Sequence, residues 1–211
     1  MKNERYISLD LLRGLAAVGV VFFHAFLTFD VVAPLFVLVD FFFVLSGFVL
    51  EPLYPKNQAD HKETKRFVLK RALRFFPMSI CSLVLSLVWF LSFQNDNQDP
   101  KHQALIWLSA SLLLQMLFTE GLKFNHPLWS LSAEWITNLF AIPVLARNKD
   151  RLLIFAIAAG YALLLYPYLF NGDALTFMTL ERTLCGLGRA MIGFFIGVLI
   201  RRKFESLRNL R

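Results

Sequence analysis

The chain has 211 residues, of which 57% are hydrophobic and 23 are phenylalanine, and its mean hydropathy is +0.55. A soluble domain of this length is less apolar, so the composition predicts a multi-pass membrane protein. The formal charge of +7 gathers in residues 56–74, 147–151 and 201–211, beside apolar segments, which argues against nucleic acid as a partner and is typical of cytoplasmic flanks. The two cysteines, Cys81 and Cys185, fit neither a disulfide framework nor a metal-ligand pattern, so no metal site is predicted.

Seven apolar segments are candidates for transmembrane helices, because a helix needs about 20 residues to cross the hydrocarbon core. They are Ile7–Phe29, Ala33–Leu53, Phe75–Phe93, Ala104–Phe118, Leu128–Ala146, Leu152–Phe170 and Leu184–Ile200. The positive-inside rule places the N-terminus, with Lys2 and Arg5, in the cytoplasm. The loop 51–74 is predicted to be cytoplasmic too, since it holds seven Lys or Arg and three acids.

The basic loops conflict with seven full crossings. If every segment crossed, residues 147–151 and 201–203 would both lie outside, against the positive-inside rule. We therefore predict that Ala104–Phe118, the shortest segment, is re-entrant, tilted or partial. The expected fold is an all-α transmembrane bundle with six full crossings and both termini in the cytoplasm, forming one membrane-embedded domain over residues 1–211.

The first apolar segment carries three polar residues on one helical face. His24 follows Arg13 by eleven residues, which returns to nearly the same azimuth about 16 Å along the axis, and Asp10 precedes Arg13 by one turn. A charge inside a span costs roughly 2.5–3.5 kcal/mol and therefore faces protein or a wet cavity. Arg13 is expected toward the cytoplasm and His24 toward the outer half, where an imidazole suits a general base. The alternative is an Asp10–Arg13 pair that only fixes helix packing, with His24 hydrogen-bonded to a neighbour.

A basic run precedes the third span. Read as a helix, it places four side chains on one face at i,i+3 and i,i+4 spacing, namely Arg66, Lys70, Arg71 and Arg74, and Pro77 is predicted to break this helix from the span. Grouped arginines can grip phosphate bidentately. Contact with anionic lipid headgroups, or a role in topology alone, is the alternative.

Further polar residues fall inside later spans. Glu134 shares a polar face with Ser130 and needs a partner such as Arg13, Arg189, His24 or water, either for function or as an interhelical ion pair. In the second span, Ser46 and Gly47 favour close helix packing, whereas Asp40 is a charge that needs another explanation. In the last span, Arg189 must face inward from a stripe of small residues: Gly186, Ala190, Gly193 and Gly197.

Taken together, five motifs in order resemble those of the acyltransferase-3 family of integral-membrane acyltransferases. They are residues 8–17 with His24, residues 42–48, residues 71–77 (with Phe75 where isoleucine is more usual), residues 129–134, and Arg189 with Phe194 and Gly197.

The resemblance implies a bacterial inner-membrane enzyme that takes an acyl group, commonly acetyl, from cytoplasmic acyl-CoA and passes it to a hydroxyl of an exported or lipid-linked carbohydrate. No permanently bound cofactor is implied. Arg13, Arg71 and Arg74 are expected to meet the CoA phosphates, and His24 acts as general base or as a transient acyl carrier. Glu134 or Asp10 would orient His24 or compensate nearby charge. The supporting residues are Asp40, Ser46, Trp129, Ser130 and Arg189.

Members of this family usually have about ten spanning helices, and this chain is expected to have six or seven. The resemblance therefore implies a natural short form, a C-terminally truncated product, or one member of a split assembly whose partner subunit supplies further helices. The rival interpretation is a non-catalytic membrane protein, either a subunit or a transporter of a polar group, since intramembrane Asp, Arg, His and Glu also suit a transport path.

Overall fold

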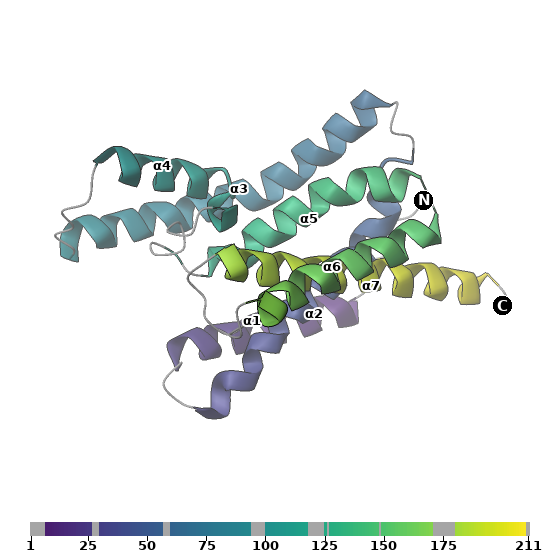
Figure 1. Cartoon of the computed structure of the whole chain (residues 1–211), viewed down its shortest axis with the longest axis horizontal. Helices are drawn as coiled ribbons and strands as arrows, with labels where there is room; N and C mark the ends of the chain where they lie inside the picture. Colours follow the sequence, from purple (N-terminus) through teal and green to yellow (C-terminus); the bar gives the residue numbers. More distant parts are fainter. Residues whose placement is uncertain are drawn as a thin grey trace.

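The computed structural model of the chain describes residues 7–26, 30–56, 60–93, 100–117, 125, 127–147, 149–170 and 180–209. Within these ranges the secondary structure is helical, which confirms the predicted all-α class (Figure 1). The α-helices are α1 (Ile7–Ala25), α2 (Leu38–Leu50), α3 (His61–Phe93), α4 (Pro100–Ser111), α5 (Leu128–Ala146), α6 (Asp150–Phe170) and α7 (Leu180–Arg208), and the short 3-10 helices are η1 (Asp30–Val37), η2 (Glu51–Leu53) and η3 (Gln115–Leu117).

Five of the described helical stretches are long and apolar enough to cross a membrane: α1, the stretch Pro34–Leu53 around α2, α3, α5 and α7. α6 adds a helix of 21 residues, about 32 Å long. α7 has 29 residues, or about 44 Å, so it extends well beyond the predicted span and beyond a hydrocarbon core of about 30 Å. The predicted first span matches α1 as far as Ala25, and its last residues, 27–29, lie outside the described residues.

The prediction that Pro77 breaks the third helix is wrong. α3 runs without interruption from His61 to Phe93 with Pro77 inside it. A proline removes one helical hydrogen bond, but packing on both sides of it can hold the helix together. Here Phe75 and Phe76 both pack edge-on against Trp135 of α5 at ring distances of 6.0 and 5.6 Å. The basic helix and the span therefore form one continuous helix.

The fourth predicted span does not cross. α4 has 12 residues, about 18 Å, and lies along the far end of α3 (Figure 1). After it the chain leaves the helix at Leu113, whose φ of 55° is in the left-handed region. Leu113 and Gln115 are then almost fully buried inside the bundle. Irregular backbone is tolerated at membrane depth where protein surrounds it, so a partial, re-entrant segment is the arrangement found.

α7 packs along both α2 and α6. Where α2 and α7 cross, a Cβ on Gly47 would overlap the carbonyl oxygen of Phe194, and one on Gly197 would overlap that of Val44. This confirms that Gly47 and the small-residue stripe of the last span serve close packing.

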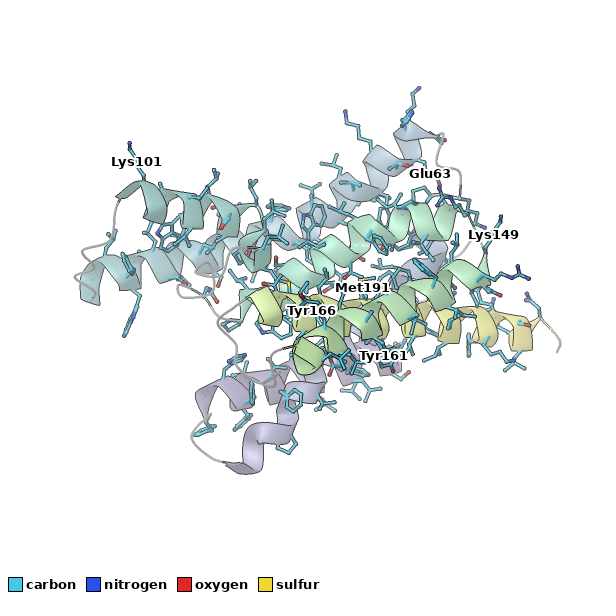
Figure 2. All side chains as sticks on the ribbon, in the orientation of Figure 1. Glu63, Lys101, Lys149, Tyr161, Tyr166 and Met191 are labelled. Atoms are coloured by element: carbon cyan, nitrogen blue, oxygen red, sulfur yellow. The ribbon has the colours of Figure 1, made fainter. Side chains whose placement is uncertain are left out.

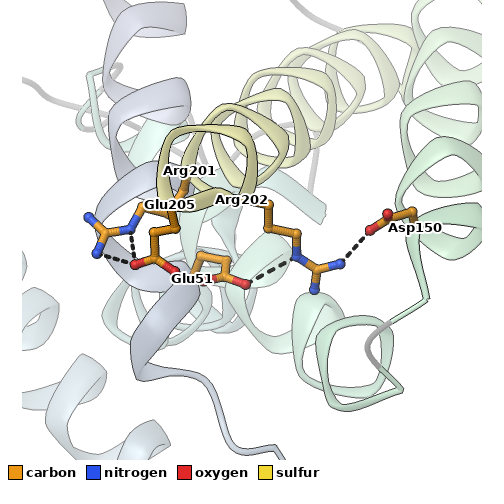
Figure 3. Close-up of polar contacts among 5 residues, drawn as sticks. All are labelled: Glu51, Asp150, Arg201, Arg202 and Glu205. Atoms are coloured by element: carbon orange, nitrogen blue, oxygen red, sulfur yellow. Dashed lines mark hydrogen bonds and ion pairs between the residues drawn. The ribbon is translucent and has the colours of Figure 1, made fainter. Parts of the chain in front are cut away.

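Ion pairs tie three helix ends together. Arg202 of α7 donates to Glu51 at the end of α2 (3.1 Å) and to Asp150 at the start of α6 (2.7 Å), while Arg201 pairs with Glu205 one turn later (Figure 3). Glu63 and Lys149 lie toward this same end of the molecule, and Lys101 lies at the opposite end (Figure 2). The basic loops are thus on one side, as six crossings require.

Candidate active site

The central feature of the bundle is a partly buried carboxylate held by two other helices. Glu134 of α5 accepts a hydrogen bond from Nη2 of Arg71 on α3 at 2.9 Å and from Oγ of Ser46 on α2 at 2.6 Å. The side chains of Arg71 and Glu134 are 6% and 18% exposed. The Arg71 guanidinium also lies 4.4 Å from the ring centre of Phe75, one turn along α3. Three helices therefore meet at one ion pair in the interior.

Two further arginines lie within electrostatic range of this pair. The charge of Arg74 acts on both Arg71 and Arg13, and the charges of Glu134 and Asp10 act on Arg13. Arg74 is exposed, Arg13 is half-buried and Arg71 is buried. All three predicted arginines of the first and third spans are thus brought to one place.

A second buried contact continues the polar cluster by one turn of α5. The hydroxyl of Tyr54, just after η2, donates toward Oδ1 of Asn138 at 2.9 Å and lies 3.2 Å from the Asn138 carbonyl oxygen. The Tyr54 ring packs on Phe67 at 4.4 Å. Burial raises the pKa of Tyr54 well above its usual value, so its hydroxyl remains a neutral donor. Asn138 follows Glu134 by four residues and therefore lies on the same face of α5.

A second ion pair joins α7 to α2. Nε and Nη2 of Arg189 donate to the two oxygens of Asp40, each at 2.9 Å, and the guanidinium stands 5.6 Å from the ring centre of Trp129. Phe43 contacts the Trp129 ring edge-on. The sequence left both charges, Asp40 and Arg189, without an assigned partner. In the structure they pair with one another.

His24 lies apart from the Glu134 cluster. Gly19 of α1 packs directly on Leu38 of α2; from that contact His24 lies five residues toward η1 and Ser46 lies eight residues toward η2. With a rise of 1.5 Å per residue, the two are about 20 Å apart along antiparallel helices, whereas Arg13 is within about 3 Å of the level of Ser46. By this estimate Glu134, which is bonded to Ser46, lies nearer the level of Arg13 than that of His24.

Residues 6–211 match the sequence family described as an acyltransferase domain, acyltransferase 3. The chain belongs to the acyltransferase-3 family. A relative named "Protein 2 in picA locus", from Rhizobium radiobacter, is 33% identical over 176 residues, which cover 74% of this chain and 92% of the relative. The comparison with solved structures finds no match.

Family membership and the spanning helices together identify a membrane protein of the acyltransferase class. The acyltransferase-3 motifs meet in the fold as two clusters, Arg71–Glu134–Ser46 with Arg13 and Arg74, and Asp40–Arg189 with Trp129. Ser130 belongs to neither, since its Oγ lies 3.2 Å from the Pro127 carbonyl at the start of its own helix.

Sequence reasoning missed Tyr54. Helical periodicity puts Asn138 on the same face as Glu134, but Tyr54 lies beyond the end of a span, between two prolines and outside any periodic pattern. Tyr54 comes next to α5 only through the path that the chain takes after η2.

Proposed function

We propose that this chain transfers an acyl group, acetyl in the expected case, from cytoplasmic acyl-CoA to a hydroxyl of an exported or lipid-linked carbohydrate. The proposed location is the bacterial inner membrane, with both termini in the cytoplasm. The observation that carries the proposal is that Arg71 is bonded to the partly buried Glu134 and that Arg13 and Arg74 lie within electrostatic range of this pair.

The net positive charge of the arginine cluster supports an anionic acyl donor. Among the described residues, the charges that act on Arg13 and Arg71 include exposed Arg74 and two carboxylates, Glu134 and Asp10, so this cluster carries one positive charge in excess. Because an uncompensated charge in a membrane is costly, an anionic ligand is the expected partner. A CoA phosphate would fit there, entering past exposed Arg74 and gripped by guanidinium groups. Glu134 and Asp10 then act by arranging these arginines.

The reaction itself is assigned to His24. Its imidazole takes the proton of the acceptor hydroxyl, and the oxygen attacks the thioester carbonyl. The carbon–sulfur bond breaks, and the leaving thiolate takes up the proton from the imidazolium, giving an ester and free CoA. Arg13 and His24 are eleven residues apart on α1, about 16 Å, which an extended pantetheine arm is long enough to bridge.

The proposed acylation of a carbohydrate is tested on the glycans of the cell surface. Surface glycans are compared by mass spectrometry between the wild-type strain, the gene deletion, and strains carrying His24→Ala or His61→Ala. His61 is an exposed histidine at the start of α3 and serves as the matched control. We expect an acyl mass increment that disappears in the deletion and in His24→Ala and remains in His61→Ala. Unchanged glycans in the deletion would refute carbohydrate acylation and favour the non-catalytic alternative.

The proposed binding of acyl-CoA by the arginines is tested by titrating purified protein with acetyl-CoA. Arg71→Ala and Arg74→Ala should weaken binding at least tenfold each, since each removes a charge-assisted contact. Arg147→Ala, an exposed arginine after α5, should leave the affinity unchanged. Equal affinity in the wild type and all three variants would mean that Arg71 and Arg74 do not bind acetyl-CoA. Their role would then be to contact lipid headgroups or to set the topology.

A further inference from the structure

The ion pair between Arg189 and Asp40 is accessible although it lies at membrane depth. The two side chains are 16% and 33% exposed. Asp40 is eleven residues from Glu51, and Arg189 is thirteen from Arg202, so the pair lies about 16–20 Å along the helices from the contact of Glu51 with Arg202 (Figure 3). That is well inside a hydrocarbon core of about 30 Å that begins at this end. Because a charge at such depth faces protein or a wet cavity and not lipid, the exposed atoms of the pair call for a polar ligand.

Two aromatic rings flank the guanidinium group of this pair. Arg189 stands 5.1 Å from the ring centre of Phe36 in η1 and 5.6 Å from that of Trp129 in α5. Its Nη2 also donates to the Phe36 carbonyl oxygen at 3.4 Å. Trp129 is buried, whereas Phe36 is 45% exposed. The accessible part of the cluster therefore combines a carboxylate, a guanidinium group and an aromatic ring.

The cluster lies between the level of the central ion pair and that of His24. Asp40 precedes Ser46 by six residues on α2, about 9 Å toward η1 by helix rise. From the contact of Gly19 with Leu38, Asp40 lies two residues toward η2 and His24 five residues toward η1, so the two are about 10 Å apart along the axis. A short stretch of an oligosaccharide covers that distance.

The chemistry of the cluster suits the hydroxyl groups of a sugar. The ion pair is balanced, so it favours a neutral polar ligand, unlike the arginine cluster with its positive excess. A carboxylate has about four acceptor positions, of which Arg189 occupies two on Asp40. Neighbouring hydroxyls can donate to the carboxylate and accept from the guanidinium, while the C–H face of the sugar ring packs on an aromatic side chain.

We propose that Asp40, Arg189 and Phe36 bind a sugar unit of the carbohydrate acceptor, with Trp129 as the residue that positions Arg189. This inference rests on the proposed function, because it names the site of its acceptor. The arginines of the first and third spans would hold the donor, and this cluster would hold the sugar beside the one whose hydroxyl reaches His24.

The test uses the full chain in detergent, acetyl-CoA, and the non-acylated glycan isolated from the deletion strain. Glycan-dependent release of CoA gives a KM for each substrate. The first variant is Asp40→Asn with Arg189→Gln, which replaces the ion pair by a neutral pair and leaves no charge alone. It should raise the KM for the glycan about tenfold or more and change that for acetyl-CoA less than about twofold, because only hydrogen bonds to the sugar are lost.

The second variant tests the ring without disturbing the ion pair. Phe36→Leu should raise the KM for the glycan about threefold, since it removes the aromatic face under the sugar, and Phe36→Tyr should restore it. Phe155→Leu is the matched control, because Phe155 is 69% exposed on α6, outside the cluster, and should leave both KM values unchanged. As Phe36 is exposed, its replacement decides the question even where the double variant does not fold.

An unchanged KM for the glycan in Phe36→Leu would overturn the inference, and so would an equal rise for acetyl-CoA in the folded double variant. The second result would assign the cluster to the pantetheine arm of the donor. Wild-type protein that releases no CoA in the presence of the glycan would refute the proposed function itself, which separates the two failures.

Discussion

Glu134 and Arg71 form a 2.9 Å salt bridge across 63 residues of sequence, and Ser46 donates to the same carboxylate oxygen. A buried ion pair contributes little net stability, because its desolvation cost offsets the attraction, but breaking it leaves a buried charge alone. The main role of the pair is therefore to fix the position of its side chains. It holds Arg71 at a fixed place and lets Arg13 and Arg74 group around it.

The first prediction concerns this pair. Glu134→Leu should lower the unfolding free energy by about 3 kcal/mol or more, because Arg71 is left buried and unpaired. Arg71→Met combined with Glu134→Leu should cost less than the sum of the two single variants. The measurement is thermal unfolding of the purified protein in detergent. Strict additivity would mean that the two side chains do not depend on one another in the folded protein.

The second prediction concerns the six crossings. Single cysteines are introduced into protein lacking Cys81 and Cys185, at Lys101, Lys149 or Glu63, which lie toward opposite ends of the bundle (Figure 2). Lys101→Cys should react with an impermeant thiol reagent added to intact spheroplasts. Lys149→Cys and Glu63→Cys should react only after the membrane is opened. Labelling of Lys149→Cys from outside would contradict the arrangement.

Much of this fold follows from the sequence because membrane spans obey simple rules. Length and apolarity gave the bounds of α5 as predicted, and the conflict among basic loops identified α4 as partial. The error at Pro77 arose because local sequence does not contain the packing of Phe75 and Phe76 on Trp135. Tertiary contacts overrode a local signal there.

The sequence was a poorer guide to which charged side chains pair across the helices. Periodicity shows that Glu134, Asp40 and Arg189 face inward, but it does not show which helices stand opposite. The sequence is compatible with Arg13, Arg189, His24 or water as the partner of Glu134, and the partner in the structure is Arg71. Partner choice depends on the order of helices around the bundle, and that order is set by close crossings such as that of α2 on α7.

The third prediction concerns the re-entrant segment. Oγ of Ser132 donates to the carbonyl oxygen of Leu113 at 2.6 Å, and Thr183 donates to the carbonyl of Met116. Ser132→Ala should destabilise the protein by about 1–3 kcal/mol, because it leaves a buried carbonyl of non-helical backbone unpaired. Ser111→Ala is the control, since Ser111 bonds the Trp107 carbonyl of its own helix. Similar unfolding temperatures for the two variants would show that Ser132 does not anchor the segment.

The fourth prediction concerns the crossing of α2 and α7, on which the position of Ser46 depends. Gly47→Ala places a Cβ against the backbone carbonyl of Phe194, which cannot move aside as a side chain could. The helices must separate, so core packing around Phe194 is lost and the unfolding temperature should fall by several degrees. The matched substitution is Gly14→Ala in α1, where a Cβ would meet nothing within 4 Å and alanine favours the helix by about 1 kcal/mol. Gly14→Ala should therefore keep or raise the unfolding temperature. Because Ser46 directly precedes Gly47, the Gly47→Ala protein should also lose acetyl-CoA affinity, and full affinity together with an unchanged unfolding temperature would show that the close crossing is not required.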